Sequence, residues 1–173
     1  MKKLLGLILA LSCLLGLSAC GGETLETPPG LRGETLETPP ELRIVSAGGT
    51  VTASKGTYSW MHNNGFNWTG IESDSIHPLE YKDLVETLTT DDATVKLEFD
   101  ITPDSITAVE CWSDEHWGGD YTTPSESFGL TYYNDTPNIT LKPGGWVYVI
   151  GASWDRENYD GSCRYVFHVI HPE

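Results

Sequence analysis

The stretch Thr94-Val-Lys-Leu-Glu-Phe-Asp-Ile101 decides the fold class of this chain. Its apolar residues alternate with charged ones, so that one face carries Val95, Leu97, Phe99 and Ile101, and the other carries Lys96, Glu98 and Asp100. A repeat of two residues is typical of a β-strand with one face in a core and one face in solvent. Such strands occur mainly in antiparallel sheets, and this stretch therefore predicts a β-protein.

The residues on both sides of this strand extend the pattern. The following Thr102-Pro103-Asp104-Ser105 predicts a turn, since proline fixes φ and the aspartate can bond backbone amides ahead of it. Residues 106–112 then predict the returning or next strand. A second pair of strands is predicted at residues 145–154 and 162–170, around a loop at 155–161.

Shorter strands and one short helix complete the expected fold. The shorter strands are predicted at residues 50–53, 57–62, 67–71, 126–133 and 138–141. Asn63-Asn64-Gly65 indicates a hairpin between two of them. Residues 78–88 predict the helix, with Pro78 in its first turn and leucines at a helical spacing. We expect an all-β antiparallel β-sandwich of the immunoglobulin-like type, with a jelly roll as the alternative.

Upstream of the strands, the chain repeats itself. Gly22-Glu-Thr-Leu-Glu-Thr-Pro-Pro-Gly-Leu-Arg32 is followed by Gly33-Glu-Thr-Leu-Glu-Thr-Pro-Pro-Glu-Leu-Arg43, and the copies differ only at Gly30 and Glu41. Two copies are too few for a solenoid, and their prolines and acids favour an extended segment over a packed one. We expect residues 20–43 to be a disordered tether and residues 44–173 to be one domain.

The N-terminus has the features of a secretory signal. Lys2 and Lys3 precede an apolar run that ends in Leu17-Ser18-Ala19-Cys20, and this run is too short to span a membrane. The last four residues resemble the lipobox of bacterial lipoproteins. That resemblance implies a signal peptide at residues 1–19, lipidation of Cys20 with acyl chains such as palmitate, and attachment to the extracytoplasmic face of the cell membrane. Plain secretory cleavage after Ala19 is the alternative.

A second resemblance covers most of the domain. The segments 54–60, 74–79, 103–106 and 141–145 (Ser-Lys-Gly-Thr-Tyr-Ser-Trp, Asp-Ser-Ile-His-Pro-Leu, Pro-Asp-Ser-Ile and Leu-Lys-Pro-Gly-Gly) are similar to those of uncharacterised lipoproteins of low-GC Gram-positive bacteria. The resemblance implies a location and a fold, and it brings no activity with it.

The charge of the chain excludes some partners. The chain has 10 basic and 25 acidic residues, a formal net charge of −15, and loss of Lys2 and Lys3 with the signal makes it more acidic. Such a surface repels phosphate backbones and anionic lipid headgroups. We expect no nucleic-acid partner, and we expect contact with the membrane through the lipid anchor.

Two cysteines remain in the expected domain, Cys111 and Cys163. Each falls on a predicted core strand of an exported protein, which favours a disulfide between them, while a pair of buried thiols is the alternative. No metal site is predicted, and calcium binding by the carboxylates of residues 111–121 is an alternative. His168 and His171 lie on a strand and its end, and the loop at residues 155–161 has Asp160 where a calcium loop requires glycine.

The candidate binding residues lie in Cys111-Trp-Ser-Asp-Glu-His-Trp-Gly-Gly-Asp-Tyr121. Aromatic faces beside polar groups on a glycine-containing loop are typical of sites that hold sugars or peptides. We expect Trp112 to be buried, and the candidate site residues are Asp114, Glu115, Trp117, Asp120 and Tyr121.

These observations favour a membrane-anchored lipoprotein whose domain is a binding or interaction module at the cell envelope. The candidate partners beyond the membrane are a cell-wall glycan or an envelope protein. A small envelope hydrolase acting on glycans is the alternative, in which two of the loop carboxylates act as acid and base. No cofactor and no catalytic residue is predicted.

Overall fold

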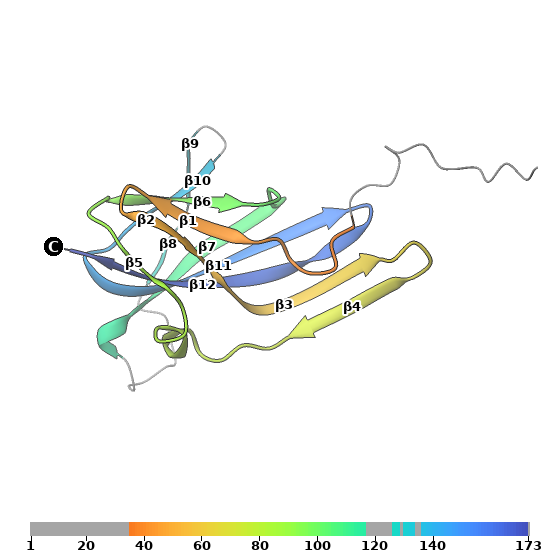
Figure 1. The fold of residues 1–173 in the computed structure, drawn as a ribbon, viewed down its shortest axis with the longest axis horizontal. Coiled ribbons are helices and arrows are strands. Elements are labelled where there is room, and N and C mark those ends of the chain that lie inside the picture. Colours follow the sequence, from red (N-terminus) through yellow and green to blue (C-terminus); the bar gives the residue numbers. More distant parts are fainter. Residues whose placement is uncertain (1–34, 117–125, 129, 134–135, 173) are drawn as a thin grey trace, which may run out of the picture. The chain divides into compact units, whose positions relative to one another are not determined.

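The protein forms two β-sheets that pack face to face (Figure 1). The structure, a computed structural model, describes residues 35–116, 126–128, 130–133 and 136–172. The chain divides into two units, Met1–Arg32 and Gly33–Glu173, and all of the described residues belong to the second.

The first sheet has the strand order β2-β1-β6-β10-β9. Its strands are β1 (Leu42–Ser46), β2 (Gly49–Thr52), β6 (Thr94–Phe99), β9 (Thr131–Tyr133) and β10 (Thr136–Thr140). The second sheet has the order β4-β3-β12-β11-β7-β8, with β5 pairing in parallel along β12. Its strands are β3 (Ser54–Asn63), β4 (Trp68–Ser73), β5 (Thr87–Thr89), β7 (Ser105–Ser113), β8 (Glu126–Phe128), β11 (Gly144–Arg156) and β12 (Tyr159–His171).

The facing sides of the two sheets make the main core. Val95 and Leu97 of the alternating stretch at residues 94–101 point into this core, as the alternation predicted. The second sheet contributes larger side chains, among them Trp60 and Trp154, whose rings meet edge to face with centroids 5.6 Å apart. The predicted all-β sandwich is therefore confirmed, while its immunoglobulin-like type stays a prediction.

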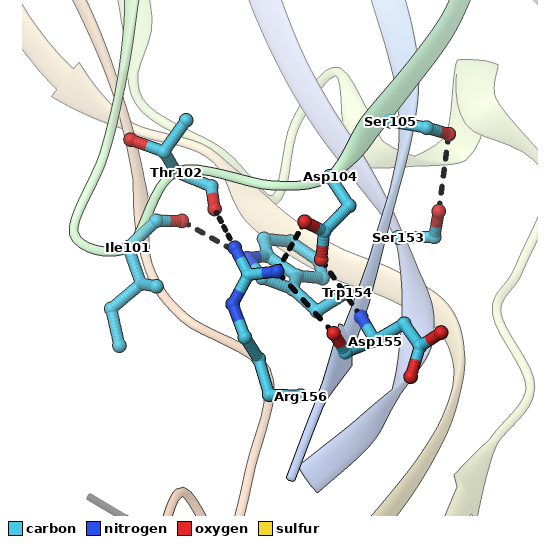
Figure 2. A network of polar contacts seen from close by, with 8 residues as sticks. All are labelled: Ile101, Thr102, Asp104, Ser105, Ser153, Trp154, Asp155 and Arg156. Atoms are coloured by element: carbon cyan, nitrogen blue, oxygen red, sulfur yellow. Dashed lines mark hydrogen bonds and ion pairs between the residues drawn. The ribbon is translucent and has the colours of Figure 1, made fainter. Parts of the chain in front are cut away.

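The turn after residues 94–101 carries the chain from the first sheet to the second. A polar network fixes this turn against the end of β11 (Figure 2). Asp104 pairs with Arg156 and accepts a hydrogen bond from the Asp155 backbone N–H at 2.9 Å. The Trp154 indole N–H donates to the Ile101 carbonyl at 3.0 Å. Arg156 and the Asp155 N–H hold the pKa of the Asp104 carboxyl below its usual range. Asp104 thus accepts a hydrogen bond from a backbone amide of β11, 51 residues further along the chain.

The predicted helix at residues 78–88 is wrong. The structure has a 3₁₀ turn, η1 (Pro78–Tyr81), capped by His77, and then strand β5. The leucines that were expected on one helix face separate: Leu79 packs on the outer side of the second sheet, Leu88 enters the main core, and Leu84 is exposed. The β-branched residues around Leu88 favour the strand. It pairs with β12 at residues 168–170, beyond Val166, the last residue of β12 that pairs with β3.

The predicted boundary between tether and domain, at residue 44, is also wrong. Leu42 is fully buried, and it opens a strand that the sequence pattern did not reveal. Pro39 and Pro40 are buried, and the Pro40 carbonyl accepts a hydrogen bond from the Tyr165 hydroxyl at 2.6 Å. The Trp60 indole N–H donates to the Leu36 carbonyl at 2.8 Å. Residues 36–43 of the second repeat copy are therefore part of the domain.

The predicted Cys111–Cys163 disulfide is contradicted as well. Both cysteines are buried thiols, so the alternative applies. Strand β11 lies between them: Cys111 pairs with Tyr148 and Cys163 pairs with Ala152. Two strand spacings of about 4.8 Å each already exceed the largest Cα separation, about 7 Å, that a disulfide spans. Burial raises the pKa of the Cys163 thiol to about 12, which keeps it protonated.

The remaining strands agree with the sequence, with one difference. The strand predicted at residues 126–133 is two strands, β8 in the second sheet and β9 in the first, so the chain changes sheet between them. The predicted hairpin at Asn63-Asn64-Gly65 is confirmed, and it joins β3 to β4. The predicted loop at residues 155–161 is a tight turn, because Arg156 and Tyr159 already pair across it.

Candidate functional site

The aromatic and acidic run at residues 111–121 begins on the outer side of the second sheet. Trp112 is buried, with 7% of its surface exposed, as predicted. It packs with Leu79, Val147, Val149 and Val166 in a second, smaller cluster beneath η1. Trp112 is therefore not a tryptophan of the main core. Of the candidate site residues, Trp117, Asp120 and Tyr121 lie outside the described residues, so their role in a binding site stays a prediction.

Asp114 lies in a polar cluster that the sequence did not indicate. It belongs to the 3₁₀ turn η2 (Asp114–His116), and its Oδ2 lies 3.3 Å from His168 Nε2 and 3.7 Å from Lys82 Nζ. The other ring nitrogen, His168 Nδ1, lies 2.9 Å from Thr87 Oγ1. A Cβ at Gly145 would collide with the Asp114 carboxylate, so a larger residue there would displace that side chain. Asp114 is thus surrounded by residues of several distant segments.

Burial lowers the pKa of His168, although Asp114 opposes this effect. The ring is therefore neutral at pH 7. Because a carboxylate only accepts hydrogen bonds, the single ring proton lies on Nε2, and Nδ1 accepts from the Thr87 hydroxyl. The order hydroxyl, imidazole, carboxylate is also that of Ser-His-Asp hydrolases. Here the ring is buried and Lys82 shares the carboxylate, which fits a cluster that positions η2 better than one that receives a substrate.

The other polar residues that were considered as ligands are dispersed. Glu115 is exposed at the surface of η2. His171 Nδ1 lies 3.0 Å from the Thr90 carbonyl, away from the Asp114 cluster. In the part of the chain that the structure describes, no group of three or more His, Cys, Asp or Glu side chains is placed to hold a metal ion.

A groove of about 710 Å³ lies on the outer side of the first sheet. It crosses β1, β6 and β10, where Lys96 lies between Val45 and Asn138 in the strand register. The other lining residues come from the same strands and the turns beside them: Ser46, Ala47, Asp92, Ala93, Thr94, Ile139 and Thr140. At one end, Asp92 Oδ2 accepts from the Ala47 N–H at 2.6 Å.

The groove presents polar side chains beside apolar ones. Lys96 supplies a cation, Asn138 an amide, and Thr94 and Thr140 supply hydroxyls that donate and accept. The sequence placed Lys96 on the solvent face of its strand and predicted a strand at residues 138–141. It carried no signal that the two strands are neighbours, so it did not reveal the groove.

No helix among the described residues is both long and apolar enough to cross a bilayer. A comparison of the chain with protein families, curated proteins and solved structures finds no match. The function therefore has to be argued from the residues themselves.

Proposed function

We propose that this protein is a membrane-anchored surface lipoprotein whose β-sandwich domain acts as a binding module at the cell envelope. The anchoring rests on the lipobox Leu17-Ser18-Ala19-Cys20. Two acyl chains hold a protein on a bilayer, because each buried methylene contributes about 0.8 kcal/mol. The binding role rests on one observation, the groove across β1, β6 and β10.

The ligand that this groove favours is a cell-wall glycan. Sugar hydroxyls both donate and accept hydrogen bonds, and so do the Asn138 amide and the hydroxyls of Thr94 and Thr140. Lys96 adds a donor and would favour a glycan with carboxylate groups. The groove crosses three neighbouring strands, which gives an extended chain several polar contacts in a row. An envelope protein is the other partner that such a surface could take.

Anchoring is tested by Cys20→Ser in the producing cell. The variant should leave the membrane fraction, or keep its signal uncleaved, because the acylated residue is missing. A variant that fractionates and migrates like the parent chain would contradict lipidation at Cys20.

Binding is tested separately with the mature chain, residues 20–173, carrying Cys20→Ser and prepared without lipid. Purified peptidoglycan is the probe, and the fraction of protein that sediments with it is the readout. Lys96→Gln and Asn138→Ala should each reduce this fraction. Lys55→Gln is the matched control, since it removes the same charge from a strand of the other sheet. Equal binding by the parent, the groove variants and the control would exclude the groove as the glycan site.

The alternative, a glycan hydrolase, gains no specific support from the described residues. Of the loop carboxylates, Asp114 is held by Lys82 and His168, and Glu115 is exposed. Asp120 lies outside the described residues. We therefore keep the binding module as the proposal.

A further inference from the structure

The turn between β3 and β4 exposes large apolar side chains. Phe66 at the tip is 94% exposed, Trp68 at the start of β4 is 47% exposed, and Met61 on β3 is 40% exposed. Soluble proteins expose single apolar residues routinely, but a cluster of three on one hairpin is typical of a contact surface. We call these three residues the hairpin patch.

Side-chain hydrogen bonds fix the conformation of the turn that exposes Phe66. Asn64 Oδ1 accepts hydrogen bonds from the N–H groups of Phe66 and Asn67, both at 3.0 Å. Asn63 Oδ1 accepts from the Gly65 N–H at 2.9 Å, and Gly65 has a φ of +94°, which favours glycine. The turn therefore presents Phe66 without needing to rearrange.

Two residues of the hairpin patch lie on the same side of the strand pair. Met61 pairs with Gly70, and Asn63 pairs with Trp68, so that Met61 and Trp68 are diagonal neighbours. A Cβ at Gly70 would lie 2.7 Å from the Met61 sulfur, which means that Met61 reaches across the position that glycine leaves empty. Strand β4 is also the edge of its sheet. The patch thus lies at a free edge and tip.

The hairpin is unusual in charge as well. Residues 56–71 contain no Asp, Glu, Lys or Arg, although the whole chain carries 25 acidic and 10 basic residues. The neighbouring turn between β11 and β12 is acidic, and its Asn158 carbonyl accepts from the Asn63 N–H at 2.9 Å. An uncharged apolar tip favours contact with an apolar environment. The acidic residues of the neighbouring turn argue against a partner that is attracted by opposite charge to this tip.

The described chain enters the domain beside this hairpin. Leu36 bonds to Trp60, which lies only three residues before the end of β3, so the chain enters the domain near the hairpin (Figure 1). About 16 residues separate Leu36 from Cys20, and such a segment spans about 20–25 Å as a coil and at most about 55 Å when extended. A domain on so short a connection stays within reach of the bilayer that holds Cys20.

We infer that the hairpin patch contacts the lipid bilayer, with Phe66 and Trp68 entering the interfacial region while the acyl chains hold Cys20. Tryptophan and phenylalanine are suited to this region, since tryptophan combines a large apolar ring with one polar N–H. Insertion of apolar side chains does not depend on attraction between charges, so added salt should not weaken the contact. Salt also screens the repulsion between the acidic domain and anionic lipids, which would strengthen the contact. This inference rests on the proposed anchoring.

The test supplies the anchor artificially, so that its outcome does not depend on lipidation of Cys20. The mature chain, residues 20–173, carries Cys20→Ser and an N-terminal hexahistidine tag, and it is attached to vesicles that contain a nickel-chelating lipid. The vesicles are phosphatidylcholine and phosphatidylglycerol, and the phosphatidylcholine has brominated acyl chains that quench tryptophan fluorescence on contact. We expect quenching of the parent chain that does not fall as salt is raised.

Variants identify the part of the chain that makes the contact. Trp68→Phe should remove most of the quenching, and Phe66→Asp should do the same while it leaves Trp68 in place. The matched control for Trp68→Phe is Trp146→Phe, which removes a tryptophan near the start of β11, away from the hairpin. The matched control for Phe66→Asp is Leu84→Asp, which adds a charge at another exposed apolar residue. Both controls should be quenched like the parent.

Three results would overturn the inference. The first is a parent chain that is not quenched, and the second is quenching that survives both hairpin variants. The third is self-association of the chain without vesicles that Phe66→Asp abolishes, because the occupant would then be a second copy of this protein. The proposed anchoring is judged apart from these results, by fractionation of Cys20→Ser in cells.

Discussion

Leu42→Ala tests whether the second repeat copy belongs to the folded core. Leu42 is fully buried, pairs with Phe99 across the sheet and packs between the two sheets. Truncation removes buried methyl groups and leaves a cavity, which for leucine costs about 2–5 kcal/mol, and we expect a loss of about 3 kcal/mol in the free energy of unfolding. The equivalent residue of the first copy is Leu31, and Leu31→Ala is the matched control.

The two variants are compared by urea unfolding of the mature chain, followed by tryptophan fluorescence. With a denaturant dependence of about 1–3 kcal/mol per molar urea, Leu42→Ala should lower the midpoint by about 1–3 M. Leu31 belongs to the separate unit Met1–Arg32, and its variant should unfold within about 0.5 kcal/mol of the parent. If both variants unfolded at the same urea concentration, residues 36–43 would not be part of the core.

Three further predictions concern the second sheet. Trp112→Ala should lower the free energy of unfolding by about 3–5 kcal/mol, whereas Trp117→Ala should change it little; equal losses in urea midpoints would make Trp117 a core residue. Cys111 and Cys163 should resist alkylation in the native chain and both react after denaturation without reductant, as intact mass would show; two unreactive cysteines would restore the bridge. Burial lowers the pKa of His168, so the folded state disfavours its proton, and stability should fall as the pH drops below the unfolded value of 6.5. Denaturant unfolding between about pH 7.5 and about pH 5 should show a flatter profile for His168→Gln, and an unchanged slope would exclude His168 as the source.

Much of the fold could be predicted because its signal is local. Alternation along residues 94–101, 145–154 and 162–170 identified three strands of the sandwich correctly, since each strand shows one face to the same core. The assignment of strands to sheets is not local. The split of residues 126–133 between two sheets and the position of β5 depend on edges that distant residues provide.

The repeat sets a sharper limit on what local sequence can tell. Leu31 and Leu42 stand in nearly the same eleven residues, yet only Leu42 lies in a described strand. The second copy is followed directly by Ile44 and Val45, which form strand β1 together with Leu42. The first copy is followed by Gly33 and Glu34. Within the copies, only Gly30 and Glu41 differ, and Glu41 pairs with Lys55 in the domain.

The candidate site was less accessible from sequence for the same reason. Asp114 and His168 are 54 positions apart, and Lys96 and Asn138 meet only through the pairing of β6 with β10. The exposed hairpin had a clear turn signal at Asn63-Asn64-Gly65. The aromatic residues beside that turn, Phe66 and Trp68, were the available indication that its tip has a further role.

The docking of one repeat copy also affects how this gene can change in length. Tandem coding repeats gain and lose units during replication, and here each unit is a whole number of codons. The copy next to Ile44 completes the sandwich through its leucine and its proline carbonyl. Units added or deleted before this copy would therefore change only the number of residues between Cys20 and the domain. If the proposed anchoring at Cys20 holds, the reach of the domain from the membrane would change in steps of one repeat unit, with no change to its core.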